Sequence, residues 1–425
     1  MENDRRLVVA GIDTHKREHA LCLLDGLGRK VFEGFFPANE QGYRELADAI
    51  GNPAECLVVG VECTMSYGAG LTRLLVNSGF NVVEVLHPEK KRRRRGSNKN
   101  DLEDAELAAR AAIAGKHTSV PKAGDGWVEA TRALMVSRRL AVKTSTAAAN
   151  TAHALIVSAP ARVREKYEGM CTEAMMKSLA RETPGGDIVE ESLYASLRQI
   201  AGMWLESRRQ ADTALELIEQ IVEENAPALT AMEGCGALTA ASLAIAAGDN
   251  PERMGSKDLF AALCGTSPVE ASSGDVKRHR LNQGGNRQAN CALHQIVLSR
   301  MKHDGRTKAY VEKRTAEGKS KKEIIRCLKR YVANEAYRAL LDPMKAPEKQ
   351  GSKIKAMRKL LGLSQREAAS MLLVSRTKIS EIECGKRRLP KMEQAYCDAL
   401  ERLAVERGWP IKAFRERSEL ALDES

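Results

Sequence analysis

The sequence lacks the cysteine patterns of a zinc site or of a secreted disulfide scaffold. Its ten cysteines are scattered over 425 residues, with no Cys-x-x-Cys pair and no neighbouring histidine ligands. It also lacks any apolar run near the roughly 18–20 residues that a membrane span needs. Its polar start is unlike a signal peptide. We therefore expect a cytoplasmic protein with reduced cysteines and no membrane association.

Positive charge exceeds negative charge in this chain. The 67 Lys and Arg residues outnumber the 56 Asp and Glu residues, which gives a formal net charge of +11 and a pI near 9.1. A protein with this charge attracts polyanions, so the composition favours a nucleic acid as partner. The length predicts two or three domains, each with its own core.

Residues 1–120 show the pattern of an α/β domain. Apolar runs at 7–12 and 19–24 predict a hairpin that is broken by the polar residues 14–17. The other expected elements are strands at 30–36, 57–61 and 82–86 and helices at 41–50, 71–76 and 101–114. Three strands followed by alternating helices and strands is the order of a ribonuclease H-like fold, although other α/β sheets share it.

The rest of the chain is expected to be mostly helical. We predict a helical coiled-coil arm at 121–227 that is interrupted near 183–186, and a mostly helical second domain at 228–342 with a Gly- and Ser-rich basic centre. Two Pro residues, a Gly and several charges at 343–352 predict a linker. A small all-α domain is expected at 353–410.

Four carboxylates stand at the expected ends of strands and helices. Asp13 follows the first strand and Glu62 follows the fourth, and these strands are neighbours in a ribonuclease H-like sheet. Asp101 and Asp104 are three residues apart at a helix start and so share a face. Converging carboxylates can bind Mg²⁺ for phosphodiester cleavage. Taken singly, the same residues could cap a helix, stabilise the positive end of the helix dipole or open a turn.

Several segments together resemble a known family. The segments Gly11-Ile12-Asp13-Thr14-His15-Lys16, Gly60-Val61-Glu62 and 99–105 resemble the RuvC-like DEDD domain of the insertion-sequence 110 (IS110) family transposases, which include the Piv-type DNA invertases. Residues 229–241 and 263–287 resemble the family's second conserved region, so the resemblance covers 7–341. Glu233 stands where the family commonly has a proline.

The resemblance implies a nucleophilic serine at Ser273, with Ser272 as the adjacent alternative. A serine that attacks phosphorus can hold a DNA end covalently and conserve the bond energy for rejoining. From composition alone, the Ser-Ser-Gly stretch is a polar turn. The cations that could hold phosphates beside it are Lys277, Arg278, Arg280 and Arg287.

Further basic residues are candidates for nucleic-acid contact or for a solvated surface. A run of six cations precedes the carboxylate helix, namely Lys90, Lys91, Arg92, Arg93, Arg94 and Arg95. Arg138 and Arg139 lie on the expected arm, and a further basic helix begins near Lys321. In each case helix-surface solubility is the alternative.

The tail, residues 354–390, resembles a helix-turn-helix of the Cro/repressor class. Ser364 is expected to cap its second helix and Ser375 its recognition helix. The candidate DNA contacts are Gln365, Arg376, Thr377 and Lys378. Leu373 replaces the usual glycine of the turn, and a small structural bundle is the alternative.

The resemblance favours a transposase or site-specific recombinase that acts on DNA with Mg²⁺ and a serine, as a homo-oligomer. It leaves open whether a guide RNA directs the protein and whether the outcome is transposition or inversion. One rival is a nuclease of the Holliday-junction resolvase kind, in which water replaces the serine. Another is a transcriptional regulator that works through its helix-turn-helix alone.

Overall fold

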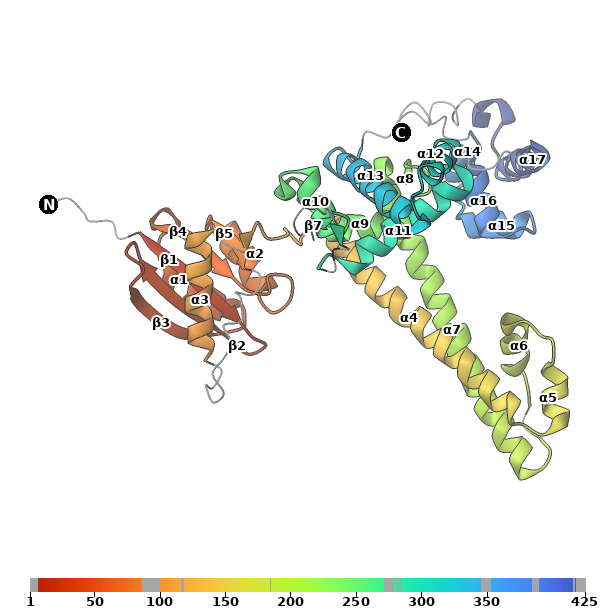
Figure 1. Ribbon diagram of the computed structural model, residues 1–425. Coiled ribbons are helices and arrows are strands. Elements are labelled where there is room, and N and C mark those ends of the chain that lie inside the picture. The colour runs from red at the N-terminus through yellow and green to blue at the C-terminus, as the bar shows by residue number, and fades with distance from the viewer. Residues whose placement is uncertain are drawn as a thin grey trace. The chain divides into compact units, whose positions relative to one another are not determined.

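The computed structural model describes residues 7–85, 100–115, 118–183, 185–270, 279–280, 282, 284–344, 353–383, 390–415 and 417. The chain divides into two compact units, Met1–Met344 and Lys345–Ser425. The first unit holds a sheet domain and a helical region, and the second is all helical (Figure 1). Among the described residues, no helix is both long and apolar enough to cross a membrane.

The sheet domain is built on a mixed sheet of strand order β3-β2-β1-β4-β5-β6. Its strands are β1 (Val8–Thr14), β2 (Glu18–Asp25), β3 (Lys30–Pro37), β4 (Cys56–Val61), β5 (Val82–Val85) and β6 (Thr118–Ser119). The first three form an antiparallel meander, whereas β4 pairs parallel to both β1 and β5. The strands lie where their apolar runs predicted them, except β6, which was not expected.

Helices cover both faces of this sheet (Figure 1). They are α1 (Glu40–Ile50), the short 3₁₀ helix η1 (Pro53–Glu55), α2 (Ala69–Asn77) and α3 (Asp101–Ala114). Alternate residues of each strand point to opposite faces. Ile12 and Val61 therefore pack in the core beneath α1 and α2, while Val9 and Cys22 pack under α3.

Two glycines allow α3 to lie directly on the sheet. Gly11 and Gly60 are register partners on β1 and β4. A Cβ atom on Gly11 would lie 2.1 Å from the backbone oxygen of Ala105, and one on Gly60 would lie 2.7 Å from that of Ala108. The helix therefore presents small alanines to strands that have no side chain at the crossing point.

The helical arm consists of α4 (Trp127–Val157) and α7 (Ile188–Asn225), which pack along each other (Figure 1). Between them lie two short helices, α5 (Ala161–Tyr167) and α6 (Thr172–Leu179), which form a small core with both long helices around Tyr167 and Met176. The arm is therefore helical as expected, but its two long helices are joined by this helical segment.

The remaining part of the first unit is a helical domain with one continuous core that includes Phe260, Leu293 and Val332. Its elements are α8 (Pro227–Thr230), α9 (Ala237–Ala247), η2 (Pro251–Met254), α10 (Lys257–Leu263), β7 (Val269–Glu270), β8 (His279–Arg280), α11 (Arg287–His303), α12 (Gly305–Ala316) and α13 (Lys321–Leu341). The base of α7 contributes Ile218 and Val222 to the same core, which anchors the arm.

The second unit contains α14 (Lys353–Leu360), α15 (Gln365–Met371), α16 (Arg376–Glu383) and α17 (Pro390–Glu406). Ser364 caps α15 in a capping box with Glu367, as its sequence predicted. In the turn between α15 and α16, Leu373 adopts a positive φ of 54° and is 94% exposed. The chain keeps the left-handed turn conformation without a glycine, at a cost of about 1 kcal/mol.

A buried carboxylate joins the helices of this unit. Glu383 on α16 accepts both guanidinium bonds of Arg358 from α14, at 2.6 and 3.0 Å. The Tyr396 hydroxyl of α17 donates to it at 2.7 Å and the Gln365 amide at 2.9 Å. Burial disfavours the charge, but the bonds from Arg358, Gln365 and Tyr396 lower the pKa of Glu383.

The same substitution, Gly→Ala, should have opposite effects on stability at Gly11 and at Gly202. Gly11→Ala should destabilise the sheet domain by about 1–3 kcal/mol, because the new methyl group forces α3 away from β1. Gly202→Ala should stabilise α7 by about 0.5–1 kcal/mol, because Gly202 is exposed within the helix and nothing lies within 4 Å of its missing Cβ. Calorimetric unfolding of the full chain measures both; stability unchanged in Gly11→Ala would contradict the close packing.

Candidate functional site

Strand alternation places Asp13 and Glu62 on the face that α3 covers. Gly11 faces α3, so Asp13, two residues further along β1, faces the same way. The same relation holds on β4 for Gly60 and Glu62. The backbone N–H of Glu62 donates to the carbonyl of Ile12 at 3.1 Å, which keeps the two strand ends in register. Asp13 and Glu62 are 6% and 8% exposed.

The helix start brings Asp101 to this edge of the sheet. Asn100 is the N-cap of α3, and its side chain accepts from the backbone N–H of Leu102 at 3.2 Å. The capping function proposed as an alternative for Asp101 is therefore performed by Asn100. Asp101 and Asp104 are both half-buried, and each continues the stripe of small residues with which α3 contacts the sheet.

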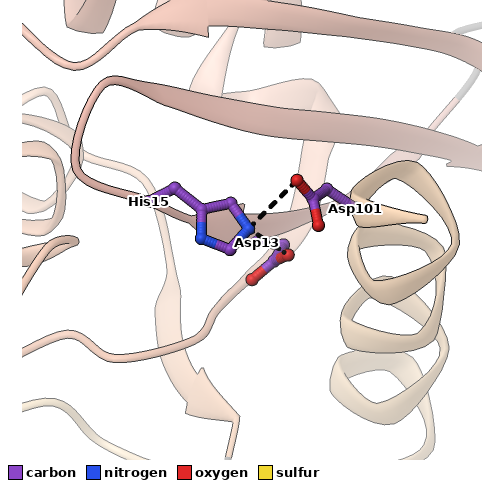
Figure 2. A group of neighbouring side chains, drawn as sticks. All are labelled: Asp13, His15 and Asp101. Atoms are coloured by element: carbon purple, nitrogen blue, oxygen red, sulfur yellow. Dashed lines mark ion pairs between the residues drawn. The ribbon is translucent and has the colours of Figure 1, made fainter. Parts of the chain in front are cut away.

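His15 lies between two of these carboxylates (Figure 2). Its Nε2 atom is 3.0 Å from Oδ2 of Asp13 and 3.2 Å from Oδ2 of Asp101. One potential ligand atom from each of these three residues lies within 4.8 Å of the others. The described residues thus bring together two of the four carboxylates and one imidazole. Glu62 follows the neighbouring strand, and Asp104 lies one helical turn after Asp101.

The turn that carries His15 is held by buried neighbours. The backbone N–H of His15 donates to Nδ1 of His19 at 3.3 Å, and the Thr14 hydroxyl donates to the carbonyl of Glu62 at 3.0 Å. Burial, followed by the nearby His15, lowers the pKa of His19 to about 4. His19 therefore stays neutral at physiological pH and can act as the acceptor.

These residues fit a divalent cation. Carboxylate oxygens are the usual protein ligands of Mg²⁺ and Mn²⁺, and an imidazole is accepted by several transition metals. In the structure, the His15 imidazole lies between the carboxylates, where a cation would be attracted. His15 stands two residues after Asp13 in the first motif, but its sequence position alone does not mark it as a ligand. The imidazole ring of His15 reaches Asp101 because α3 packs against the strand ends.

The other acidic residues of α3 are directed elsewhere. Glu103 is exposed, and Glu106 forms ion pairs with Lys30 at 3.1 Å and Arg110 at 2.7 Å. Hydrogen bonds from Arg110 and Lys30 lower the pKa of Glu106. Glu106 therefore belongs to an ion-pair network with Lys30 and Arg110, away from the cluster around His15.

Ser272 and Ser273 lie outside the described residues, as do Lys277 and Arg278, but the flanks of their segment are described. Val269 on β7 pairs with Arg280 on β8. A Cβ on Gly285 would lie 2.3 Å from the backbone nitrogen of Gly265, so the chain crosses itself closely there. The side chain of Asn290 donates to the carbonyl of Cys264 at 2.7 Å. These contacts hold the two flanks together.

Lys329 supports this crossing from within the core. It belongs to the basic helix that begins near Lys321, but it is 8% exposed and its Nζ donates to Oδ1 of Asn290 at 2.7 Å. Desolvation lowers the pKa of Lys329. The next residue, Arg330, donates to the Ser267 hydroxyl at 2.5 Å and pairs with Asp258. Both cations thus bind protein groups near the serine segment.

The other residues expected to contact nucleic acid differ in their exposure to solvent. Lys90 to Arg95 lie outside the described residues, and nothing is described of the Arg280 side chain. Arg138 is half-buried on α4, whereas Arg139 is exposed beside it and Arg287 is exposed at the start of α11. On α16, Thr377 and Lys378 are exposed and Arg376 is half-buried. The Gln365 amide is engaged with Glu383.

Comparison with known proteins assigns families to three parts of the chain. Residues 10–159 match the DEDD-type IS110 transposase model, described as a transposase, and residues 226–312 match the model of the transposase IS116/IS110/IS902 family. Residues 351–414 match a helix-turn-helix domain. The first match includes all four carboxylates, the second includes the serine segment, and the third confirms the helix-turn-helix expected in the tail.

A curated relative comes from Streptomyces coelicolor. It is the insertion element IS110 uncharacterized 43.6 kDa protein, and it is 29% identical over 157 residues. The match covers 37% of this chain and 37% of the relative. The relative thus supports the family and carries no activity over to the whole chain.

The cluster around His15 predicts which carboxylates affect cation binding. Asp101→Asn should weaken Mn²⁺ binding about tenfold or more, because it removes an anionic ligand beside His15. Glu103→Gln changes the same charge on the same helical turn, but on an exposed side chain, and should leave binding unchanged. Electron paramagnetic resonance of free Mn²⁺ measures both affinities. Equal affinities in the two variants would remove Asp101 from the site.

Proposed function

We propose that the chain is a recombinase of the IS110 transposase family that cuts and rejoins DNA strands, because residues 10–159 and 226–312 match two models of that family. The proposal uses a carboxylate site in the sheet domain and a serine in the helical domain. The observation that carries it is the approach of Asp101 on α3 to Asp13 on β1, with His15 between them. Glu62 at the end of the adjacent parallel strand extends this edge.

The strand order supports a ribonuclease H-like fold for the sheet domain. An antiparallel meander followed by parallel β4 and β5, with α3 across β1 and β4, gives one carboxylate from each of the two central strands. We assign Asp13, Glu62, Asp101 and Asp104 as the ligand set. When bound there, Mg²⁺ would supply charge stabilisation at the phosphate. Asp13 and Glu62 would hold the ion from the two strand ends, and Asp101 and Asp104 would hold it from the first turn of α3.

Ser273 is the proposed nucleophile of strand exchange. Its Oγ attacks phosphorus, loses its proton and forms a new P–O bond, while the bond to the departing 3′-oxygen breaks and that oxygen takes up a proton. Attack by another 3′-hydroxyl reverses the step and releases the serine. On either side of this segment, Gly265 and Gly285 approach each other closely, so the described flanks are held together. The resemblance to the family selects Ser273 over Ser272.

The remaining parts suit recognition and assembly. We propose that the helix-turn-helix binds duplex DNA through Thr377 and Lys378, which are exposed on α16. The second unit is compact by itself, which supports a role as an added domain for targeting or autoregulation. The arm of α4 and α7 is proposed to assemble protomers into a homo-oligomer. Arg139 is exposed on the same arm and could contact a nucleic acid. A guide RNA bound there is one way in which the protein could be directed to its target.

The carboxylate assignment makes Glu62 indispensable for cleavage. Glu62→Gln keeps the shape but removes an anionic charge, so strand cleavage should fall by at least about a hundredfold while DNA binding is retained. Glu55→Gln, at the opposite end of β4, should cleave normally. Cleavage of a labelled DNA substrate, in saturating Mg²⁺, measures the activity of both variants. Wild-type cleavage by Glu62→Gln would refute the assignment.

The serine assignment separates a recombinase from a metal-dependent nuclease. A reaction quenched in denaturant should retain labelled DNA on the protein, and peptide mapping should place it at Ser273. Ser273→Ala should lose both the adduct and strand exchange, because water cannot conserve the bond energy. Mn²⁺ binding should persist, since no proposed ligand lies in that segment.

Ser272→Ala is the matched control for this experiment. It should form the adduct and exchange strands normally. Loss in Ser272→Ala together with normal activity in Ser273→Ala would move the nucleophile by one residue. Normal cleavage by both variants, with no adduct, would instead favour the resolvase-type nuclease.

A further inference from the structure

An open pocket of about 370 Å³ adjoins the carboxylate cluster. Its lining comes from the turn after β1, from the segment after β4 and from the start of α3. The lining residues are His15, Lys16, Arg17, Glu18, Tyr67 and Asp101. His15 and Asp101 belong to the proposed metal site, whereas the other four have no assigned function. The volume falls in the range of about 300–1,000 Å³ that is typical of small-molecule sites, and is sufficient for one nucleotide.

Tyr67 is an aromatic residue exposed on a firmly held segment. The residue is 53% exposed, and its side chain has no hydrogen bond or ring contact among the residues that the structure describes. The segment begins at Glu62, whose carbonyl accepts the Thr14 hydroxyl at 3.0 Å. It ends at Gly68, where a Cβ would lie 3.1 Å from the same carbonyl oxygen.

The backbone of this segment also has a strained position. Cys63, directly after Glu62, has a positive φ of 54°, which a non-glycine residue adopts at a cost. The backbone N–H groups of Ser66 and Gly68 both donate to the carbonyl of Cys63, at 2.9 and 3.3 Å. The turn that presents Tyr67 is thus fixed by bonds within the segment and by its contacts with the strand ends. An exposed aromatic ring on a firmly held backbone is a surface for stacking.

Two cations complete the pocket. Lys16 and Arg17 are exposed on the turn after β1, and within the described part of the chain neither forms an ion pair. Glu18, the first residue of β2, is the neighbouring acidic residue of the lining, so the turn with its two cations carries a net positive charge. Cations at the rim and an aromatic ring in the wall are the two elements that single-stranded nucleic-acid sites combine.

We propose that this pocket holds one unpaired nucleotide of the DNA strand that is cut. Its base stacks on Tyr67, and Lys16 and Arg17 contact its flanking phosphates. The adjoining phosphate then lies towards Asp13 and Asp101. An unpaired nucleotide is required because a base within a duplex has no free face for the ring. This inference rests on the proposed function, and it adds the substrate subsite that positions the strand.

Photocrosslinking locates the base without requiring cleavage. The probe is a 20-nucleotide oligothymidylate with 5-iodouracil at each position, mixed with the full chain in EDTA and irradiated. Peptide mapping should place an adduct at Tyr67. Tyr67→Phe should keep the adduct, because the ring remains. Adducts that form elsewhere on the chain but not at residue 67 in either protein would overturn the proposal.

A comparison of two oligonucleotides measures the stacking. Fluorescence anisotropy gives the affinity of the full chain for oligothymidylate and for an abasic oligonucleotide of the same length. Tyr67→Ala should reduce the preference for the base-containing strand by about fivefold or more, because stacking on one aromatic residue contributes about 1–3 kcal/mol. Tyr67→Phe should retain the preference. Its loss in Tyr67→Phe would indicate a bond from the hydroxyl and overturn the stacking.

Phe32→Ala is the matched control for truncation of an aromatic residue. Phe32 is 40% exposed on β3 and pairs with Leu23, so it lies on the sheet face opposite the carboxylates. The Phe32→Ala variant should keep the preference for oligothymidylate over the abasic strand. An equal loss of this preference in Phe32→Ala and Tyr67→Ala would overturn the subsite. Both assays run without metal. Stacking at Tyr67 in a protein that never cleaves DNA would therefore refute the proposed function alone, whereas cleavage without stacking would refute this subsite alone.

Discussion

The candidate site depends on one packing contact, the crossing of α3 over β1 and β4 at Gly11 and Gly60. Without side chains at these positions, the backbone of α3 lies directly on the strands. The distance is fixed because a helix backbone cannot be compressed, and protein interiors leave little free volume. The first turn of α3 therefore lies over the strand ends, and Asp101 reaches the carboxylate of Asp13 through His15.

Most of the sheet domain was predictable from periodicity and turn signals. The apolar runs of β1 to β5 and the amphipathic pattern of α1 have strong local signals, and their bounds differ from expectation by one or two residues. The two-residue strand β6 is too short to show a period. The helices α5 and α6 at the arm's tip are also short, and their core with Tyr167 depends on both long helices.

The candidate site was only partly predictable for a related reason. Asp13, Glu62 and Asp101 stand next to element ends, which local sequence signals reveal. The contribution of His15 depends on the distance between two segments that are far apart in sequence, and no local pattern reports that distance. The burial of Lys329 is similar, since its sequence is that of a basic surface helix and only its bond to Asn290 shows otherwise.

Strain is concentrated beside the residues proposed to contact nucleic acid. Cys63 adopts a positive φ directly after Glu62, and Leu373 does so in the turn before the proposed recognition helix. Neither is a glycine, so the surrounding hydrogen bonds must hold each conformation. At Cys63 the strain turns the chain back towards the strand ends and places Tyr67 in the pocket wall. Leu373 lies in the turn between α15 and α16. In both places a fixed backbone presents exposed side chains in a defined direction, which favours binding because little conformational entropy is lost when a ligand arrives.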